Sequence, residues 1–357
     1  MGHEYSGSSM AARTSSRRIS GELAFIEAIR RRVGTGRSGS SGLRLGIGDD
    51  CAVLRPKAGH EICVTTDFTV EGVHFRRDWH PPESVGHRCL ARGLSDLSAM
   101  GAEPLAVFLS LAIPARLPVG WVDRFLNGFL ALADEHGVAL AGGDTAESPG
   151  AGRSRNGLVR DGLIFVDIVA VGQVRRGKAV LRSGARPGDW IYVTGALGGS
   201  AAELAALGAN PRRFRGVTQA GAGHPHLYPE PRIAVGRRLR RLASAMIDLS
   251  DGLSTDLTHL CEESGVAAVI EEAALPVDAL AVAGRNRLGL ALNGGEDYEL
   301  LFTAPSEARV PRRVAGVAIQ RIGVVKRRGR KTPRMSMKTL EGRQRQVLPG
   351  GWEHFRD

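Results

Sequence analysis

The chain has 357 residues, 43% hydrophobic and 24% charged, which is enough for two domains, and its four scattered cysteines form no Cys-x-x-Cys pair that would indicate a zinc site or a disulfide framework. No apolar run reaches the roughly 20 residues of a membrane helix, and the polar N-terminus lacks an apolar signal-peptide core, so we expect a cytoplasmic protein that does not bind membranes. The formal charge of +11 arises in residues 309–345, where thirteen Lys or Arg accompany a single Glu without interleaved aromatics, and this favours a solvated Arg-rich face over a nucleic-acid site.

The first part of the chain alternates between helix and strand patterns. Residues 1–19 are rich in Ser, Gly and Arg, and we expect a disordered extension there. Ser20 can cap a helix that runs to residue 33. Patterning then predicts helices at 84–100 and 119–136, strands at 61–67, 105–113, 138–141 and 162–172, and loops at 34–42 and 151–156. We assign residues 20–174 to the first domain.

The composition changes around residues 175–187, where we place the connection to a second domain that spans residues 175–357. Patterning in this part predicts strands at 190–194 and 245–249, helices at 201–207 and 231–242, a further helix that ends at 263, and an irregular stretch at 208–229. Each half therefore combines helices with strands.

Carboxylates beside glycines recur along the sequence. In Gly-Ile-Gly-Asp-Asp-Cys-Ala-Val-Leu, which spans residues 46–54, Asp49 and Asp50 are neighbours before an apolar, strand-like run. Adjacent like charges repel, so a cation is expected to join them. A solvated turn has the same pattern and remains the alternative.

The next acids lie at the ends of predicted elements. Thr65, Thr66 and Asp67 end a strand, where oxygen ligands are well placed for a hard cation. Asp96 lies near the C-terminal end of its helix, where the helix dipole disfavours a carboxylate. Either a metal or exposure to water would compensate for this.

Two later motifs combine glycines with acids. In Gly-Gly-Asp-Thr, Gly143 lets a phosphate or ribose approach the backbone and Asp144 can hold a metal or a hydroxyl, with a tight turn as the alternative. In Asp-Leu-Ser-Asp-Gly, either Ser250 or Asp251 can cap the next helix. Capping explains one acid but not both Asp248 and Asp251.

The donor groups collected in these motifs are carboxylates and hydroxyls without a His or Cys cluster, a set that selects Mg²⁺ over zinc or redox metals. Many carboxylates for several Mg²⁺ ions imply a highly charged substrate such as a triphosphate. The sequence contains no Gly-x-Ser-x-Gly and no haem or iron–sulfur spacing. Metal-assisted phosphoryl transfer is the chemistry that remains.

Seven motifs, in order and at similar spacing, resemble those of the thiamine-monophosphate kinase family. The resemblance runs from about residue 20 to the C-terminus. The motifs are Gly-Ile-Gly-Asp-Asp-Cys-Ala, Thr-Thr-Asp-(x)3-Glu-Gly-Val-His-Phe, Leu-Ser-Asp-Leu-Ser-Ala-Met-Gly-Ala, Gly-Gly-Asp-Thr, Arg-Ser-Gly-Ala-Arg-Pro-Gly-Asp, Ile-Asp-Leu-Ser-Asp-Gly-Leu and Gly-Gly-Glu-Asp-Tyr-Glu-Leu.

The resemblance implies a two-domain α/β (α+β) fold of the aminoimidazole ribonucleotide synthetase type and a homodimer in which the N-terminal domains pair their sheets. It implies ATP- and Mg²⁺-dependent phosphorylation of thiamine monophosphate to thiamine diphosphate, the last step of thiamine diphosphate biosynthesis, by direct transfer of the γ-phosphoryl group. The N-terminal domain would bind ATP and Mg²⁺.

The same resemblance assigns roles residue by residue. The metal-associated residues would be Asp50, Thr65, Thr66, Asp67, Asp96, Asp144, Asp248 and Asp251, with Asp49 as the adjacent acid. ATP would contact Gly143, Asp144, Arg182 and Ser250, and the catalytic residues would be Asp67, Asp96, Asp251 and Arg182. The thiamine moiety would be held by His74, Glu296 and Trp352.

Other members of the superfamily are the alternatives. A selenophosphate synthetase would carry a reactive Cys or selenocysteine with a nearby Lys before the first acidic motif, and residues 34–45 contain neither. A ribonucleotide synthetase would have a Lys-containing sequence at 70–75, and the hydrogenase maturation protein would end in a reactive Cys. These absences favour the kinase. A non-catalytic polyanion or nucleic-acid binder is the rival from another class, and its binding would fall steeply with salt and survive removal of Mg²⁺.

Overall fold

The computed structural model describes residues 22–33, 42–150, 162–221, 223–284 and 286–355. The expected extension at 1–19, the Ser20 cap and the loop at 151–156 lie outside these ranges, as does the loop at 34–42 apart from its last residue. Among the described helices, none combines the length and the apolar character needed to cross a membrane.

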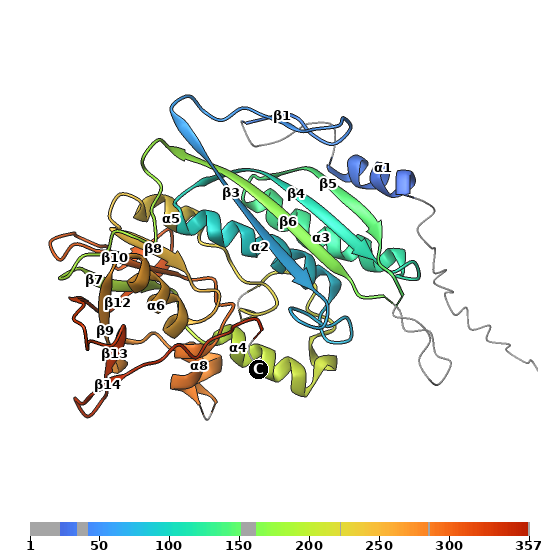
Figure 1. Cartoon of the computed structure of the whole chain (residues 1–357). Helices are drawn as coiled ribbons and strands as arrows, with labels where there is room; N and C mark the ends of the chain where they lie inside the picture. The colour runs from blue at the N-terminus through green and yellow to red at the C-terminus, as the bar shows by residue number, and fades with distance from the viewer. Residues whose placement is uncertain (1–21, 34–41, 151–161, 222, 285, 356–357) are drawn as a thin grey trace, which may run out of the picture.

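The first half of the chain is built on a four-stranded sheet. Its strand order is β3 (His60–Val70), β6 (Phe165–Arg175), β4 (Glu103–Ile113) and β5 (Ala139–Glu147), and only the β4–β5 pair is parallel. Helices α2 (Pro82–Ala99) and α3 (Val119–Glu135) cover one face, and α1 (Glu22–Val33) lies beside β5 (Figure 1). Leucines, phenylalanines and isoleucines from these helices and strands form the first core.

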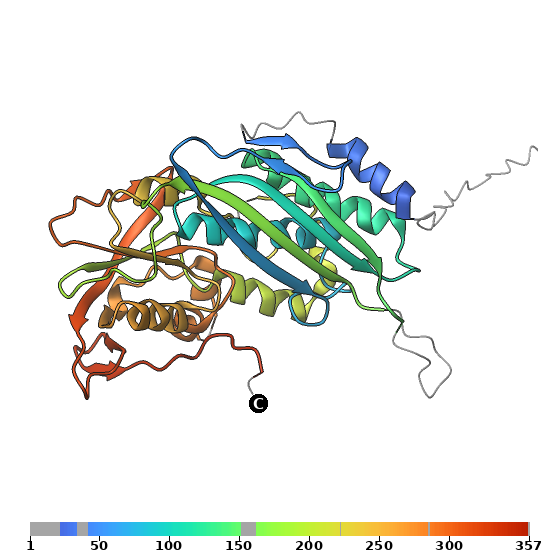
Figure 2. The same cartoon turned by 45° about the horizontal axis from the view of Figure 1, so that its top comes forward.

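The other face of this sheet is partly open. Side chains alternate along β3, so Thr65 and Asp67 point toward α2, whereas Ile62, Val64 and Phe68 are 44%, 61% and 63% exposed on the opposite side. A hairpin of β1 (Leu43–Leu45) and β2 (Val53–Leu54) covers the β4–β5 end of this face (Figure 2). The side chains of Ile62, Val64 and Phe68 form an exposed apolar patch on β3.

The second half is built on an eight-stranded sheet. Its first six strands along the chain are β7 (Trp190–Thr194), β8 (Ala245–Asp248), β9 (Val266–Glu271), β10 (Leu300–Ala304), β11 (Arg313–Val314) and β12 (Val317–Arg327), and β13 and β14 complete it. The path runs β14-β13-β9-β12-β7-β10-β8, with β11 paired to β12 and β13 (Met335–Lys338) parallel to β9. The Arg-rich segment therefore forms strands β11 to β14 (Gln344–Gln346), and Ile322, Val325, Met335 and Met337 from β12 and β13 belong to the core of this half.

Helices cover both faces of the second sheet. Helix α6 (Leu253–Glu263) packs against β8, β9 and β13, and α5 (Ile233–Leu239) contributes Val235 and Leu239 to the core on the other face. The shorter elements are α4 (Gly199–Ala209), η1 (Pro211–Phe214), η2 (Glu272–Ala274), α7 (Ala279–Val282) and α8 (Arg287–Asn293).

Helix α2 joins the two halves. It contacts β3 and β6 on one side and α5 and β8 on the other, and sixteen of its eighteen residues are buried. Glycines allow the close crossings: a Cβ at Gly86 would lie 2.0 Å from the Phe125 carbonyl oxygen, and one at Gly236 would lie 2.0 Å from that of Ser98. The polar face of α2 is thereby fixed at the junction of the two sheets.

Strand β5 is longer at its C-terminal end than the sequence predicts. The sequence predicts that the strand stops at residue 141 before a Gly-Gly-Asp turn, but β5 continues to Glu147 in parallel register with β4. Gly143 lies opposite Leu109, and a Cβ there would lie 1.9 Å from the Leu109 carbonyl oxygen. The glycine permits a close strand approach, so Asp144 belongs to a strand and not to a turn.

Candidate active site

Three carboxylates from distant parts of the sequence meet where the two halves join. Asp67 comes from β3, Asp96 from α2 and Asp248 from the end of β8, and all three line one cavity. Burial raises the pKa of Asp67 to about 6 and that of Asp248 to about 7, and repulsion by Asp96 is the next cause for both. Burial also raises the pKa of Asp96. Mutual repulsion of this kind favours the binding of cations.

Hydroxyl groups orient two of these acids. Ser95 Oγ donates to Asp248 Oδ2 at 2.7 Å, and the Thr65 hydroxyl donates to the Asp96 carboxylate. The third acid is less satisfied, because Asp67 Oδ2 is buried without a hydrogen-bond partner. Buried polar atoms are normally paired, so this oxygen is a candidate ligand atom.

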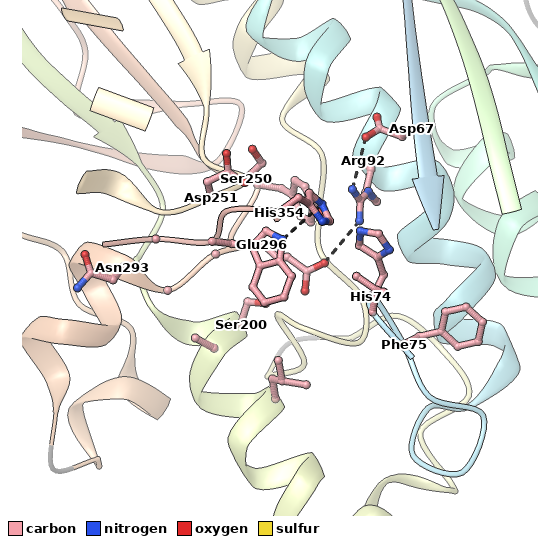
Figure 3. Close-up of a pocket in the computed structure, with 18 of the residues that line it drawn as sticks. Asp67, His74, Phe75, Arg92, Ser200, Ser250, Asp251, Asn293, Glu296 and His354 are labelled. Atoms are coloured by element: carbon pink, nitrogen blue, oxygen red, sulfur yellow. Dashed lines mark hydrogen bonds and ion pairs between the residues drawn. The ribbon is translucent and has the colours of Figure 1, made fainter. Parts of the chain in front are cut away.

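The cavity that these acids line has a volume of about 780 Å³ and lies between the two halves of the chain (Figure 3). The first half contributes the end of β3, the loop that follows it and α2. The second half contributes α4, the loops after β8 and α8, and the C-terminal segment. The lining includes Asp67, His74, Arg92, Asp96, Ser200, Asp248, Ser250, Asp251, Glu296, Trp352 and His354.

At the end of the cavity away from the acids, Glu296 is held by the protein itself. Its backbone is left-handed, with φ 63°, and both carboxylate oxygens accept from Arg88 Nη2 at 2.7 Å. Arg88 Nη1 donates to the His74 carbonyl oxygen at 3.0 Å, and its side chain is only 4% exposed. This arginine fixes the loop of His74 and the carboxylate of Glu296 together.

The His74 ring is a neutral hydrogen-bond donor toward the cavity. Burial, followed by the Arg92 charge, lowers the pKa of His74 to about 4. Its Nδ1 accepts from the Val70 backbone N–H at 3.0 Å, so the proton of the neutral ring is on Nε2. The side chain thus offers one N–H to a ligand.

The C-terminal segment closes this end of the cavity. Gly351 N donates to Thr255 Oγ1 at 3.1 Å, and Trp352 N donates to the Asp251 carbonyl oxygen at 3.1 Å. A Cβ at Gly351 would lie 2.0 Å from that same carbonyl, so glycine is required for this contact. The Trp352 indole remains 54% exposed and lines the cavity.

A second cavity of about 400 Å³ opens on the other side of the acids. It is lined by residues of β3, the C-terminal part of α2, β8 and the connection that carries Arg182. Asp96 and Asp248 line both cavities, so the two spaces meet at this pair. The Arg182 charge lowers the pKa of both acids, although burial outweighs it.

Comparison with known proteins assigns this architecture to a family. The chain matches the family described as AIR synthase related protein, N-terminal domain, over residues 48–174, and the corresponding C-terminal domain over residues 186–336. It is 40% identical over 294 residues to the thiamine-monophosphate kinase of Salmonella typhimurium, which covers 81% of this chain and 84% of the relative. The chain belongs to the thiamine-monophosphate kinase family.

Solved structures of the thiamine-monophosphate kinase family agree with the present fold. The enzyme of Stenotrophomonas maltophilia superimposes with a TM-score of 0.71 at 34% identity, covering 88% of this chain and 95% of that one. AaThiL complexed with AMPPCP and TMP gives a TM-score of 0.70 at 29% identity, covering 94% and 97%. The resemblance drawn from the seven motifs and the expected two-domain α/β fold are thereby confirmed.

Most residues to which the kinase motifs assign a role are brought together. Each of the following lines one or both cavities: Thr65, Asp67, His74, Asp96, Arg182, Asp248, Ser250, Asp251, Glu296 and Trp352. Because they come from β3, α2, β8 and several loops, their proximity depends on the packing of the two sheets against α2.

Five residues of the same motifs lie elsewhere in the chain. Asp49 and Asp50 are exposed in the loop between β1 and β2. Thr66 is exposed on the open face of the first sheet, because it alternates with Thr65 along β3. Gly143 and Asp144 are exposed in β5. None of these five lines either cavity.

The expected cap of helix α6 is wrong. The helix begins after Gly252, and neither Ser250 nor Asp251 caps it with its side chain. Asp256 Oδ2 instead accepts from the backbone N–H groups of Asp251 and Gly252, at 3.1 and 3.0 Å. This arrangement leaves the side chains of Ser250 and Asp251 in the cavity lining.

Sequence reasoning missed two arginines and one acidic cluster. Arg88 and Arg92 lie on α2 at intervals of four residues before Asp96, a spacing that places all three on one helix face. Asp256 and His259 lie close to Asp251, with ligand atoms of the three within 4.8 Å of one another. The four-residue spacing was the signal available in the sequence.

Proposed function

We propose that this protein transfers the γ-phosphoryl group of ATP directly to the phosphate of thiamine monophosphate. The observation that carries the proposal is the pair of adjoining cavities that share Asp96 and Asp248. ATP would occupy the space beside Arg182, and thiamine monophosphate the space that ends at Glu296. Donor and acceptor phosphates would then meet at the shared acids, as in-line transfer requires. Family membership at 40% identity supports the same reaction.

The acids of the site fit Mg²⁺. The donors nearest to one another are carboxylates and the Thr65 hydroxyl, and an oxygen of Asp67 is buried without a partner. Asp67, Asp96, Asp248 and Asp251 would hold the metal, with Thr65 beside them. When bound, Mg²⁺ would screen the charge of the two phosphate groups and align them.

The acceptor needs no general base. The second pKa of a phosphate monoester is near 6, so the attacking oxygen is already ionised at pH 7. The barrier is the repulsion between two polyanions, and the site is built to lower it. Arg182 would neutralise charge on the nucleotide side, and the buried acids would act on the transferring group only through the cations that they hold.

The thiamine moiety would occupy the Glu296 end. Its thiazolium ring is a permanent cation, for which a carboxylate and an indole face are suitable partners. Glu296 is fixed by Arg88, and Trp352 is held in the cavity wall through its backbone. The Nε2–H of His74 would donate a hydrogen bond to the ligand.

We propose a homodimer that covers the open face of the first sheet. Ile62, Val64 and Phe68 expose apolar side chains there, which is costly in water. Thr66 and Asp144 lie on the same face, so their proposed metal contacts depend on this assembly or on movement of the chain. Phe68→Glu should yield a monomer in sedimentation measurements; a dimer of unchanged affinity would contradict this surface.

We place the reaction in the cytoplasm. Cys51, Cys63, Cys89 and Cys261 are all free thiols, as expected in a reducing compartment. Fractionation of the host cell tests this assignment.

The test of the proposed function is the formation of thiamine diphosphate from thiamine monophosphate and ATP, with Mg²⁺ and with EDTA. We expect product only with Mg²⁺, and a large loss in Asp67→Asn. Asp123→Asn is the matched control, because this aspartate is 59% exposed and pairs with Arg32 on the surface. No product from folded protein that binds ATP would refute the assigned acceptor.

A further inference from the structure

Two arginines of α2 face the junction, and the protein uses them differently. Arg88 is engaged on both sides, because Nη1 donates to the His74 carbonyl oxygen and Nη2 to both oxygens of Glu296. It lies behind Glu296 and does not line the cavity. We therefore assign it a positioning role only.

Arg92 lines the cavity and is held loosely. Its Nη2 lies 3.5 Å from Asp67 Oδ1, and its Nη1 lies 3.8 Å from Glu296 Oε1. Both separations exceed the 2.7–2.9 Å typical of charge-assisted hydrogen bonds. Its Nε, like that of Arg88, is buried without a hydrogen-bond partner. The guanidinium therefore has N–H donors to offer to an incoming anion.

The position of Arg92 matches one part of the acceptor. It lies between Asp67 at the acid end and Glu296 at the thiamine end, as Figure 3 shows. Thiamine monophosphate must place its phosphate between these ends, with the thiazolium ring toward Glu296 and the attacking oxygen toward the acids. The phosphate would thus lie beside Arg92.

The rest of the cavity supplies no equivalent cation. Among its described lining residues, Arg76 and Arg92 are the arginines, and none is a lysine. The Arg76 guanidinium lies 4.7 Å from the centre of the Trp79 ring, and its Nε lies 3.3 Å from Asp78 Oδ1. A dianion entering among five carboxylates needs a cationic partner, and Arg92 is the arginine that lies near both Asp67 and Glu296, at the two ends of the cavity.

We propose that Arg92 binds the phosphate of the acceptor. This inference rests on the proposed function. Two guanidinium N–H groups would donate to two phosphate oxygens and leave the third for attack on the γ-phosphorus. The same movement loosens the pairing of Arg92 with Asp67 and frees that carboxylate for metal. Arg92 would thus couple binding of the acceptor to completion of the metal site.

The test compares thiamine monophosphate with thiamine, which has the same ring but no phosphate. Dissociation constants are measured by calorimetry with Mg²⁺ present, for the wild type, Arg92→Met and Arg92→Lys. In Arg92→Met we expect binding of thiamine monophosphate to weaken about 10- to 100-fold and binding of thiamine to stay unchanged. Arg92→Lys keeps the charge but loses the planar fork, so its loss should be smaller.

Arg76→Met is the matched control, because it removes one arginine from the same cavity, and it should leave the ratio of the two affinities unchanged. Equal weakening of both ligands in Arg92→Met would overturn the inference in favour of a purely structural role, and so would unchanged affinities. Failure of the proposed function is distinguishable, because then the wild type itself would not bind thiamine monophosphate more tightly than thiamine and would form no thiamine diphosphate.

Discussion

The two ends of the central cavity are organised in opposite ways. At one end Asp67, Asp96 and Asp248 repel one another, and their pKa values are raised. At the other end Glu296 is held by Arg88 at 2.7 Å. The acid end is thus incomplete without added cations, whereas the Glu296 end is shaped before any ligand arrives.

This difference indicates that the two ends contribute to different steps, one to binding of the acceptor and the other to phosphoryl transfer. A preorganised end can fix the cationic ring of the acceptor without reorganisation. An end of mutually repelling acids gains stability only when cations bind and contributes mainly when charge is being transferred. Four changes test this contrast, from the largest expected effect to the smallest.

Asp96→Asn should have the largest effect, because Asp96 lines both cavities and repels the other two acids. We expect kcat to fall about 10²- to 10³-fold, the loss typical of one electrostatic group at a reacting centre. The free energy of unfolding in EDTA should rise, because a like charge is removed. Kinetics and urea denaturation measure the two effects, and retained activity would contradict the role of the acid end.

Arg88→Met should strongly destabilise the protein. The side chain of Arg88 is 4% exposed, and its removal leaves the Glu296 carboxylate partly buried without its main partner. We expect a loss of about 3 kcal/mol in the free energy of unfolding, as for other broken buried pairs.

Arg176→Met is the control for this change. That arginine is 86% exposed and lies 3.9 Å from Glu61, so its loss should cost no more than about 0.5 kcal/mol. Equal effects of the two substitutions in urea denaturation would show that the Glu296 end is not preorganised by Arg88.

The metal-free protein should lose stability as the pH rises. The pKa values of Asp67 and Asp248 in the folded state are about 6 and about 7, above their ordinary value of 3.8. From about pH 4 to about pH 7 the folded state therefore binds more protons than the unfolded state. The stability due to these groups is complete below pH 4 and lost as the pH rises through 6 and 7.

Urea denaturation in EDTA across pH 4 to 8 measures this loss. Mg²⁺ should reduce it by pairing with the ionised acids, and Asp248→Asn should remove part of it. A slope that neither Mg²⁺ nor this substitution alters would exclude the acid cluster as its cause.

Trp352→Ala should have the smallest effect. The indole is 54% exposed and its backbone makes the segment's contact with Asp251, so the fold should be retained. Loss of one cation–π contact should raise KM for thiamine monophosphate about tenfold and leave KM for ATP unchanged. Phe355→Ala is the control, since that ring is also exposed. An equal rise in both KM values would remove Trp352 from the thiamine end.

Sequence patterning predicted the position of several helices and strands to within a residue or two. Strand β7 begins and ends where expected, and α3 differs by one residue at its end. Asp248 ends β8, whereas β3 continues for three residues past Asp67 to Val70, so the strand end predicted at Asp67 is wrong. Both acids were still predicted as site residues, because oxygen donors beside a strand pattern are distinctive. The boundary between domains near residue 174 stays a prediction, as do the individual roles of the site residues.

The remaining features depend on tertiary packing. Helix α2 is buried almost all round, so the four-residue spacing of Arg88, Arg92 and Asp96 places them on one helix face but does not show that this face borders a cavity. Strand β5 continues through Gly143 because it pairs there with β4. The Gly-Gly-Asp sequence is typical of a turn and gives no sign of this pairing. In the Arg-rich segment, Arg321 stacks over Trp190 with 4.3 Å between its guanidinium carbon and the ring centre, a contact between strands far apart in sequence.

The most direct test of the account is a single-turnover experiment with ATP labelled in the γ-phosphate, excess enzyme, thiamine monophosphate and Mg²⁺. If the two cavities bring donor and acceptor together at Asp96 and Asp248, the label should pass to thiamine diphosphate at the rate at which ATP disappears, without a labelled protein on the way. Label that first accumulates on the protein, or ATP that is consumed at the same rate without thiamine monophosphate, would contradict direct transfer between adjoining sites.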